Sequence, residues 1–471
     1  MVENSNTANA TPTKSFFVTM LTRDISLADA ILDLVDNCLD GVLRESEDDT
    51  NPIDYSQYSV RIDLDKDRFS IVDNCGGIPI EIARNYAFKL GRETDDDRDS
   101  KKETIGMYGI GMKRALFKMG EESFVKTRNN SDHYEVRISS KWLESKTWDS
   151  LPITELTEDD DLKESGTIIQ VDNLHNGVKK HFDNDHFVSE LRVAIGEHFT
   201  TFLKKGFQIY VNDVSIKPVF LEVLVLENPE GPAPFFYRKE TDEVTVTMVI
   251  GLNSRKLFYD EDVVDLEDYK LPETAGWTIF CNERAVIVGD KSRITGWGDN
   301  LPFYHAQFAI ITGMVEFRSN RADKLPVTTT KRALDTSSDI WLQTRTKMME
   351  AMRVWIDYTN KWKNHPRADQ KQYWEGAKPM SLHEATNVVL ENRKTKKLSD
   401  GGVEYNPRKD KVLTYPDKEK PSSRRIVFTR PLEEIKFVSE GLFDRDDEKP
   451  KIVGEHCFER VLEEFRKMEV Q

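Results

Sequence analysis

Residues 33–40 read Asp-Leu-Val-Asp-Asn-Cys-Leu-Asp, and this stretch decides how the rest of the chain is interpreted. Apolar residues recur around it at helical spacing, so we expect a helix over residues 27–44 that Ser26 caps. Asp33, Asn37 and Asp40 stand at i, i+4 and i+7, which places them on one strip of that helix. Taken alone, such a strip is more typical of an exposed acidic helix face.

A second stretch, residues 73–79, reads Asp-Asn-Cys-Gly-Gly-Ile-Pro and follows two expected strands at residues 60–64 and 69–72. The second strand delivers Asp73 directly into a turn. A carboxylate at that point can accept a hydrogen bond from an exocyclic amine such as that of adenine, and Gly77 would let the backbone approach a base closely. A simple Asp-Asn-x-Gly turn is the alternative.

A third stretch, residues 106–111, reads Gly-Met-Tyr-Gly-Ile-Gly and enters an expected helix at residues 112–118. It fits neither the Walker A nor the Rossmann pattern. Glycines at a helix entry nevertheless expose backbone N–H groups and the positive end of the helix dipole to phosphates. Lys113 or Arg114 could add positive charge. A helix-capping turn is the alternative.

Together the three stretches supply what a magnesium–nucleotide site needs. Magnesium prefers hard oxygen ligands and is usually held by one or two protein groups together with phosphates. Asn37 offers one such ligand. Asp33, one helical turn earlier, could orient or deprotonate a water aimed at a terminal phosphate. The sequence therefore predicts a site for Mg²⁺ and ATP.

In this order and spacing, the stretches resemble the Bergerat-fold (GHKL) ATPase superfamily of gyrase B subunits, MutL proteins, large heat-shock chaperones, histidine kinases and MORC proteins. The likeness is closest to the MORC and heat-shock-chaperone branch through residues 105–113, Ile-Gly-Met-Tyr-Gly-Ile-Gly-Met-Lys. Residues 165–169, Ser-Gly-Thr-Ile-Ile, resemble a fourth family element. Residues 212–213 and 282–284 resemble strand-turn segments of the family's transducer domain, so the likeness covers about residues 15–340.

The resemblance implies a role for each matching residue. Asn37 would hold Mg²⁺, Asp73 and Thr167 would read adenine, residues 106–113 would wrap the phosphates, and Lys331 would reach the terminal phosphate. Residues 92–103 would belong to a lid that orders over ATP and couples the nucleotide to dimerisation. The nucleotide-contacting candidates are Asn37, Asp40, Asp73, Gly77, Ile78, Gly106, Gly109, Ile110, Gly111, Met112, Lys113 and Thr167; the catalytic candidates are Asp33 and Lys331; and the metal ligand is Asn37.

The chain departs from the family pattern at two positions. The family's hydrolytic base is usually Glu, whereas this chain has Asp33, which is one methylene shorter, so we expect slow hydrolysis. Cys75 stands where the family has the first glycine of its D-x-G-x-G motif, and Gly76 can absorb the turn instead.

These features predict an α+β fold in three parts. A Bergerat α/β sandwich for ATP is expected at residues 15–185, an α/β transducer-like domain at 186–340, and a mixed helical and basic region, suited to a partner, at 341–471. We expect the second part to follow a helical stretch near residues 187–203 and to include a strand at residues 207–211. A long amphipathic helix is expected at residues 340–362 and another at 455–468.

Composition narrows the class of protein. The net charge of −16 argues against nonspecific binding of polyanions by the whole chain. Residues 361–425, however, hold 16 Lys and Arg against nine Asp and Glu, a local +7 that permits a nucleic-acid or acidic-partner surface or a solvated linker. The four cysteines form no C-x-x-C, and no apolar run suggests a membrane helix or a signal peptide. A cytoplasmic protein is expected.

The leading interpretation is a slow Mg-dependent ATPase that acts as a dimerising clamp or switch. The alternative is an ATP-binding or chaperone-like module with little or no hydrolysis. A histidine kinase would need a phosphoacceptor His on a preceding helix, and no His precedes His133. A client protein or partner subunit fits the acidic chain, and DNA fits the late basic stretch; a salt-dependent DNA complex would separate the two.

Overall fold

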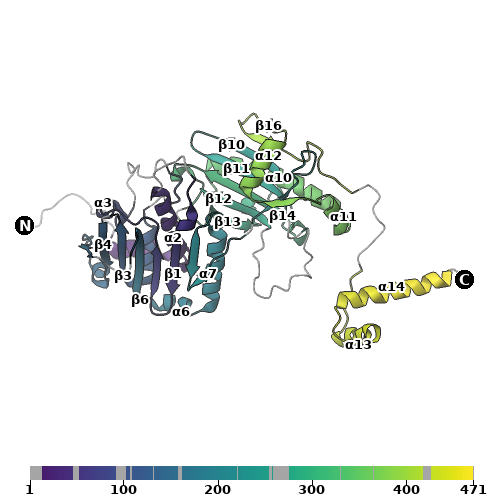
Figure 1. The fold of residues 1–471 in the computed structure, drawn as a ribbon, viewed down its shortest axis with the longest axis horizontal. Helices are drawn as coiled ribbons and strands as arrows, with labels where there is room; N and C mark the ends of the chain where they lie inside the picture. The colour runs from purple at the N-terminus through teal and green to yellow at the C-terminus, as the bar shows by residue number, and fades with distance from the viewer. Residues whose placement is uncertain are drawn as a thin grey trace, which may run out of the picture. The chain divides into compact units, whose positions relative to one another are not determined.

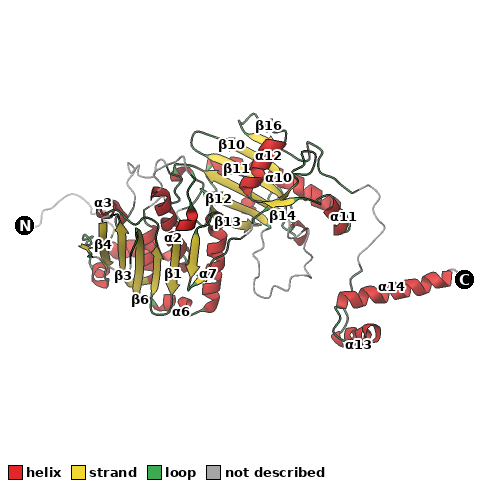
Figure 2. Cartoon of the chain, viewed as in Figure 1, coloured by secondary structure: helices red, strands yellow, loops and turns green. Residues whose placement is uncertain are grey.

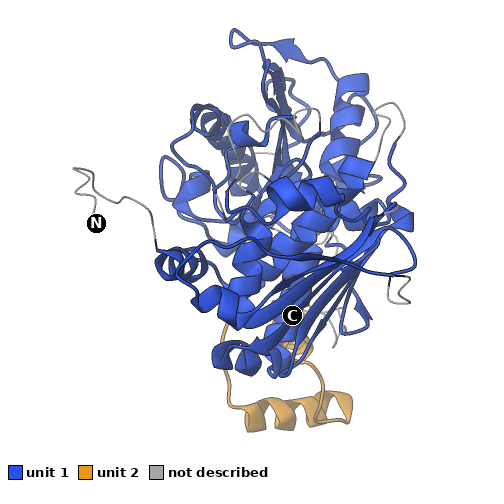
Figure 3. Ribbon diagram, turned by 90° about the vertical axis from the view of Figure 1, so that its left-hand side faces the viewer, with its two compact units in different colours: residues 1–416 blue, residues 417–471 orange. Residues whose placement is uncertain are grey.

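The computed structural model describes residues 13–45, 52–91, 102–106, 109–130, 132–157, 162–219, 221–253, 257, 275–328, 330–363, 365–416 and 426–469. It divides the chain into two compact units, residues 1–416 and 417–471 (Figure 3). The three-part division expected from the sequence stays a prediction. No helix in these ranges is long and apolar enough to cross a membrane.

The first unit begins with an eight-stranded mixed sheet in the order β5-β4-β3-β6-β2-β1-β7-β8 (Figure 1). Buried residues alternate along its strands, as in β1, where Val60, Ile62 and Leu64 are buried between more exposed neighbours. Alternation of this kind is typical of a sheet with one covered face. The strands are β1 (Ser59–Leu64), β2 (Phe69–Asp73), β3 (Gly120–Asn129), β4 (Asp132–Ile138), β5 (Ile153–Glu155), β6 (Gly166–Leu174), β7 (Gln208–Val211) and β8 (Val214–Ser215).

Helices cover that face and share one apolar core with it (Figure 2). The central one is α2, which buries its stripe of Ile31, Leu34, Val35 and Val42 completely. Full burial of each such side chain contributes about 1.5–3 kcal/mol, so α2 is firmly seated. The helices are α1 (Lys14–Arg23), α2 (Leu27–Glu45), α3 (Ile80–Ile82), α4 (Gly111–Met119), α5 (Ser140–Glu144), α6 (Asn176–Phe182), α7 (Asp185–His198) and α8 (Thr200–Lys204), with short helices η1 (Tyr55–Gln57) and η2 (Ala83–Ala87).

A second, seven-stranded sheet follows in the order β13-β12-β14-β11-β10-β17-β16. Its central strands are buried on both faces, because a long helix, α10, packs on one side and α12 packs on the other. In this part of the chain β9 and β15 pair in a separate two-stranded sheet. The strands and helices of this part are β9 (Val223–Val225), β10 (Phe235–Glu240), β11 (Thr245–Leu252), β12 (Gly276–Cys281), β13 (Arg284–Asp290), η3 (Arg293–Thr295), η4 (Ala306–Phe308), β14 (Ile311–Arg318), η5 (Ala322–Lys324), α10 (Asp339–Trp362), α11 (Arg367–Gln372), β15 (Lys378–Met380), α12 (Leu382–Asn392), β16 (Lys396–Lys397) and β17 (Val403–Tyr405).

The described residues of the second unit, which spans 417–471, include the helices α13 (Leu432–Phe443) and α14 (Pro450–Glu469). Among its described residues, Val453 and Ser439 are buried, while Phe437, Phe458 and Phe465 are more than half exposed. The expected helix at residues 455–468 lies within α14.

Most expected elements are present within a few residues, and the α+β class is confirmed. One expected strand was assigned to the wrong sheet. The run at residues 207–211 forms β7, which pairs in parallel with β1 of the first sheet, so it does not belong to the second. Sequence alone could not reveal this, because a short apolar strand carries no signal for its partner. Residues from 341 onward were expected in the third part of the chain. Within residues 339–405, β16 and β17 belong to the second sheet, and α10 and α12 pack on it.

Candidate functional site

Three acidic residues in the middle of α2 are buried, so this part of the helix is not an exposed acidic face. Asp33, Asp36 and Asp40 are each at most 2% exposed, whereas Asn37 is exposed. The Ser26 hydroxyl accepts a hydrogen bond from the Asp29 N–H, so the predicted cap forms. Buried carboxylates require partners, and the structure supplies them from three other parts of the chain.

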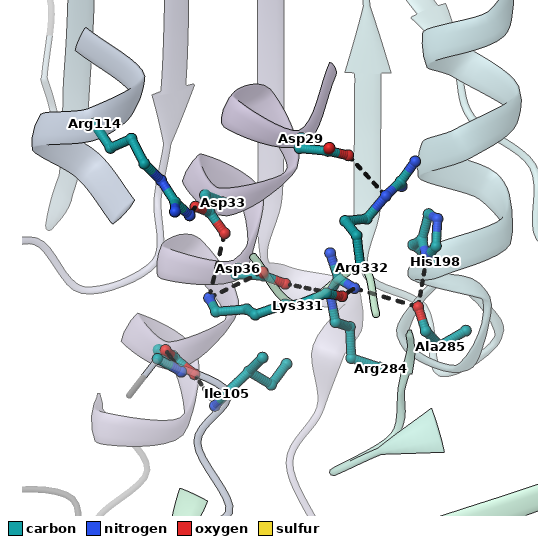
Figure 4. Close-up of polar contacts among 12 residues, drawn as sticks. Asp29, Asp33, Asp36, Ile105, Arg114, His198, Arg284, Ala285, Lys331 and Arg332 are labelled. Carbon is teal, nitrogen blue, oxygen red and sulfur yellow. Dashed lines mark hydrogen bonds and ion pairs between the residues drawn. The ribbon is translucent and has the colours of Figure 1, made fainter. Parts of the chain in front are cut away.

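Asp33 lies between two cations. Its Oδ2 is 2.5 Å from Nη2 of Arg114 on α4, and its Oδ1 is 3.6 Å from Nζ of Lys331. A Cβ on Gly111 would lie 3.4 Å from the same carboxylate, so the start of α4 lies directly beside Asp33. Asp33 and Lys331, the catalytic pair predicted from sequence, are far apart in the chain, yet their side chains lie close together in the structure (Figure 4).

Asp36 was not among the predicted site residues, yet it is the most enclosed acid of the cluster. Its Oδ1 is 2.9 Å from Nε of Arg284, and its Oδ2 is 3.1 Å from Nζ of Lys331. Burial would raise the pKa of Asp36, but Arg284 and Lys331 outweigh it and hold that pKa below its usual range. Burial alone would lower the pKa of Lys331, while Asp36, Asp33 and Asp40 raise it. The pair is therefore charged.

Asp40 holds the entrance to the glycine loop. Its carboxylate accepts hydrogen bonds from the backbone N–H groups of Ile105 at 2.8 Å and Gly106 at 2.7 Å. A Cβ on Gly106 would lie 2.4 Å from this carboxylate, so the close approach requires glycine. Burial raises the pKa of Asp40 above its usual value. In this structure Asp40 binds the loop itself.

The glycine loop leads into α4 as predicted. Gly109 has a φ of 63°, Ile110 precedes the first helical residue, and α4 begins at Gly111. Met112 packs against the first core, and Lys113 is buried, its Nζ donating to the carbonyls of Ala87 at 2.8 Å and of Gly109. Lys113 thus stabilises the loop from within. Met107, Tyr108 and residues 92–101, which include most of the expected lid, lie outside the described residues.

Asp73 ends β2 directly opposite Thr167 of β6, so the two residues predicted to read adenine lie on neighbouring strands. The carboxylate accepts hydrogen bonds from the Cys75 N–H at 2.8 Å, from the Cys38 thiol at 3.4 Å and from the Thr167 N–H. No cation contacts it among the described residues. Burial therefore raises the pKa of Asp73 to about 6, even though these three hydrogen bonds lower it.

The turn after Asp73 depends on two glycines with positive φ, 96° at Gly76 and 70° at Gly77. Gly76 thus takes the strained position in place of the missing first glycine. A Cβ on Gly77 would lie 2.0 Å from the Arg128 carbonyl, so no larger residue fits. The Thr127 hydroxyl accepts a hydrogen bond from the Ile78 N–H at 2.8 Å and lies 3.4 Å from the Thr167 hydroxyl.

Lys331 contacts α2, which covers the first sheet, from a tight loop that follows β14. The loop is closed by the Thr328 N–H, which donates to the Ala333 carbonyl at 3.0 Å, and Lys331 itself has a φ of 55°. Beside it, Nε of Arg332 lies 2.7 Å from Oδ1 of Asp29 at the start of α2. Two consecutive cations of this loop therefore contact the acidic helix.

Three site residues were missed from sequence: Asp36, Arg284 and Thr127. Asp36 stands three residues after Asp33 and four before Asp40, so helical spacing places it on the same face and could have identified it. Arg284 lies in the segment 282–284, which was singled out for its turn and not for its charge. Thr127 offers no pattern of its own, because its contact with Ile78 joins residues 49 apart in sequence.

Comparison with known proteins is consistent with this geometry. Residues 25–167 match the family model described as histidine kinase-, DNA gyrase B-, and HSP90-like ATPase. No curated protein matches the chain. The matched range contains α2, the turn after β2, the glycine loop and Thr167, whereas Lys331 and Arg284 lie beyond it. Residues 25–167 therefore match an ATPase domain of the GHKL type, the type that the three stretches predicted.

Proposed function

We propose that this chain is a Mg-dependent ATPase whose nucleotide state controls association of two copies, as a clamp or switch. The observation that carries the proposal is the convergence of Asp33, the start of α4 and Lys331 at one point. A carboxylate, a helix N-terminus and a lysine are the groups needed to orient a water, hold phosphates and stabilise the charge that develops on the terminal phosphate.

The residues present fit the nucleotide and its metal. Asn37 presents an exposed amide on the helix that carries Asp33, so its oxygen would serve as the protein ligand to Mg²⁺, which would neutralise phosphate charge. The Asp73 carboxylate, which lacks a cation among the described residues, would accept the adenine amino group, with Thr167 and Gly77 beside it. Gly109, Ile110 and Gly111 would present backbone N–H groups to phosphates at the start of α4.

In this proposal Asp33 acts as the hydrolytic base. Its Oδ2 is held by Arg114, which leaves Oδ1 on the side of Lys331. The short side chain and the tight pair with Arg114 both favour slow turnover. They equally support the alternative, an ATP-binding switch that hydrolyses little.

The partner of the switch is proposed to be protein. Several basic residues of the 361–425 stretch are occupied internally: Arg408 by Asp357 at 2.5 Å, Lys409 by Glu404 at 2.8 Å and Lys378 by Glu227 at 3.1 Å. The stretch therefore offers a polyanion fewer cations than its composition suggests. Retention of duplex DNA at low salt with a steep loss at high salt would contradict this part of the proposal.

The decisive test compares Mg-dependent ATP turnover in the native chain, Asp33→Asn and Asp33→Glu, with ATP affinity measured alongside. Loss of a general base costs about 10²–10⁴-fold in rate, so Asp33→Asn should lose turnover while it still binds ATP. Asp33→Glu retains the charge opposite Arg114 and should keep or raise turnover. Binding without turnover in all three would leave the switch alternative, and absence of ATP binding by the native chain would refute the proposal.

A further inference from the structure

The two-residue turn between β12 and β13 contacts three parts of the proposed nucleotide site. Cys281 pairs with Arg284 at the end of this hairpin, and the turn residues Asn282 and Glu283 have φ values of 48° and 67°. Two consecutive positive φ values are typical of the type I′ turn of a tight hairpin. The side chains that flank this turn are therefore held on a rigid support.

Asn282 contacts the chain where the expected lid joins the glycine loop. Its Nδ2 donates to the Thr104 carbonyl at 2.9 Å and to the Ser319 carbonyl at 2.9 Å, while its Oδ1 accepts from the Ser319 N–H at 2.9 Å. The side chain is 2% exposed and uses its polar atoms fully. Thr104 directly precedes Ile105 and Gly106, which Asp40 holds.

Arg284 contacts the backbone of Lys331 directly and is linked to the Lys331 amine by Asp36. Its Nη1 donates to the Lys331 carbonyl at 2.8 Å, and its Nε pairs with Asp36 Oδ1 at 2.9 Å. The other Asp36 oxygen accepts from Lys331 Nζ at 3.1 Å. These contacts form a closed ring of three residues in which both the backbone and the amine of Lys331 are fixed (Figure 4).

The arrangement requires arginine. A planar guanidinium can donate to a carboxylate and a carbonyl at the same time, whereas a lysine ammonium is a flexible point charge. The side chains of Arg284 and Asp36 are 1% and 0% exposed, so water does not compete for these bonds. Lys331 has a backbone conformation that non-glycine residues rarely adopt, and this conformation needs support from its surroundings.

We propose that Arg284 is a positioning residue: it holds Lys331 in the place from which Lys331 contacts the terminal phosphate of ATP. This inference rests on the proposed function, because Lys331 is there the group that distinguishes ATP from ADP. Arg284 acts through Asp36 and the Lys331 backbone and does not itself touch the nucleotide. The same turn holds Thr104, next to the start of the glycine loop, through Asn282.

The test is the ratio of ADP to ATP dissociation constants in the presence of Mg²⁺, a readout that does not require hydrolysis. The chains compared are the native protein, Arg284→Gln, Lys331→Met and the double variant. A charge-assisted hydrogen bond to phosphate corresponds to about tenfold in affinity. We expect Arg284→Gln and Lys331→Met each to lose most of the native preference for ATP, with ADP affinity kept within about twofold.

In the double variant, Arg284→Gln should change the ratio no further, because its effect passes through Lys331. A matched control is Arg345→Gln, which removes another arginine of the same part of the chain, one that pairs with Asp299 at 2.6 Å; its ratio should equal the native one. If Arg284→Gln does not fold, Arg284→Lys replaces it, since it keeps the charge opposite Asp36 but not the two-way hydrogen bonding, and should lose part of the preference.

Two results would overturn the inference. If Lys331→Met loses the ATP preference while Arg284→Gln and Arg284→Lys keep it, Lys331 acts without Arg284, and the proposed function stands alone. If the two substitutions have independent, multiplicative effects in the double variant, Arg284 acts by another route. A native chain that binds neither nucleotide would instead refute the proposed function itself, and the inference with it.

Discussion

Buried carboxylates have charged partners at one end of the proposed nucleotide site and uncharged partners at the other. At the phosphate end, Asp33 and Asp36 are matched by Arg114, Arg284 and Lys331, and the pKa of Asp36 is lowered. At the base end, Asp73 is surrounded by uncharged donors, and its pKa rises to about 6. Both lie on the same side of one sheet, so the difference comes from their partners.

The comparison shows how each end is suited to its proposed task. At the phosphate end, Arg284 of β13 and Lys331 of the loop after β14 pair with Asp36 of α2 and so link the two sheets. Separating the two sheets would leave these charges buried without partners. The base end needs no such link. A carboxylate whose donors are all uncharged can accept one more hydrogen bond from a neutral amine, and binding that amine favours the ionised form of the carboxylate.

The largest expected effect on stability is at the phosphate end. Asp36→Asn leaves Arg284 and Lys331 in a buried site without their shared carboxylate, and breaking such a pair costs about 3–5 kcal/mol. Urea unfolding of the native and variant chains at pH 7 would measure it. Asp213→Asn is the control, since Asp213 forms an exposed pair with Arg61 and should cost less than about 1 kcal/mol. Equal losses in the free energy of unfolding for the two variants would contradict the role of Asp36 in linking the two sheets.

The next effect concerns affinity at the base end. Asp73→Asn replaces a charged acceptor of the adenine amino group with a neutral one, and hydrogen bonds to charged groups contribute about 1.5–3 kcal/mol. ATP affinity should therefore fall by roughly 10–100-fold, as calorimetry or fluorescence titration would show. Because binding favours ionised Asp73, the native-to-variant affinity ratio should also fall as the pH drops below about 6. A ratio that is constant from pH 5 to 8 would remove Asp73 from the base contact.

The third effect, on stability at the base end, has the opposite sign to that of Asp36→Asn. The folded pKa of Asp73, about 6, lies above its unfolded value, so between about pH 4 and 6 the folded state binds the extra proton and stability falls as the pH rises. Asp73→Asn removes this dependence. The variant should match the native chain near pH 4 and exceed it by about 3 kcal/mol at pH 7, because one pKa unit corresponds to about 1.4 kcal/mol. Thermal unfolding across that range tests the sign, and a variant less stable at pH 7 than at pH 4, relative to native, would contradict it.

Much of the local structure follows from the sequence because its causes are local. The helical periodicity around residues 33–40 predicts α2, and the strand before Asp73 predicts the turn that needs Gly76 and Gly77. The order of the three stretches indicates the ATPase type that the family match then confirms. The roles assigned to Asp33, Asn37, Thr167 and Lys331 remain predictions, which the arrangement of their side chains supports.

What the sequence by itself determined is therefore the domain type, the helix that carries Asp33 and Asn37, and the glycine turns, since periodicity and backbone conformation act over a few residues. Only the tertiary structure decided that β7 joins the first sheet, that Asp40 binds the start of the glycine loop, and that Arg284 and Lys331 meet Asp36 across 248 and 295 residues. The physical reason is that a buried charge needs an opposite charge nearby in space, and no local pattern specifies which distant residue supplies it.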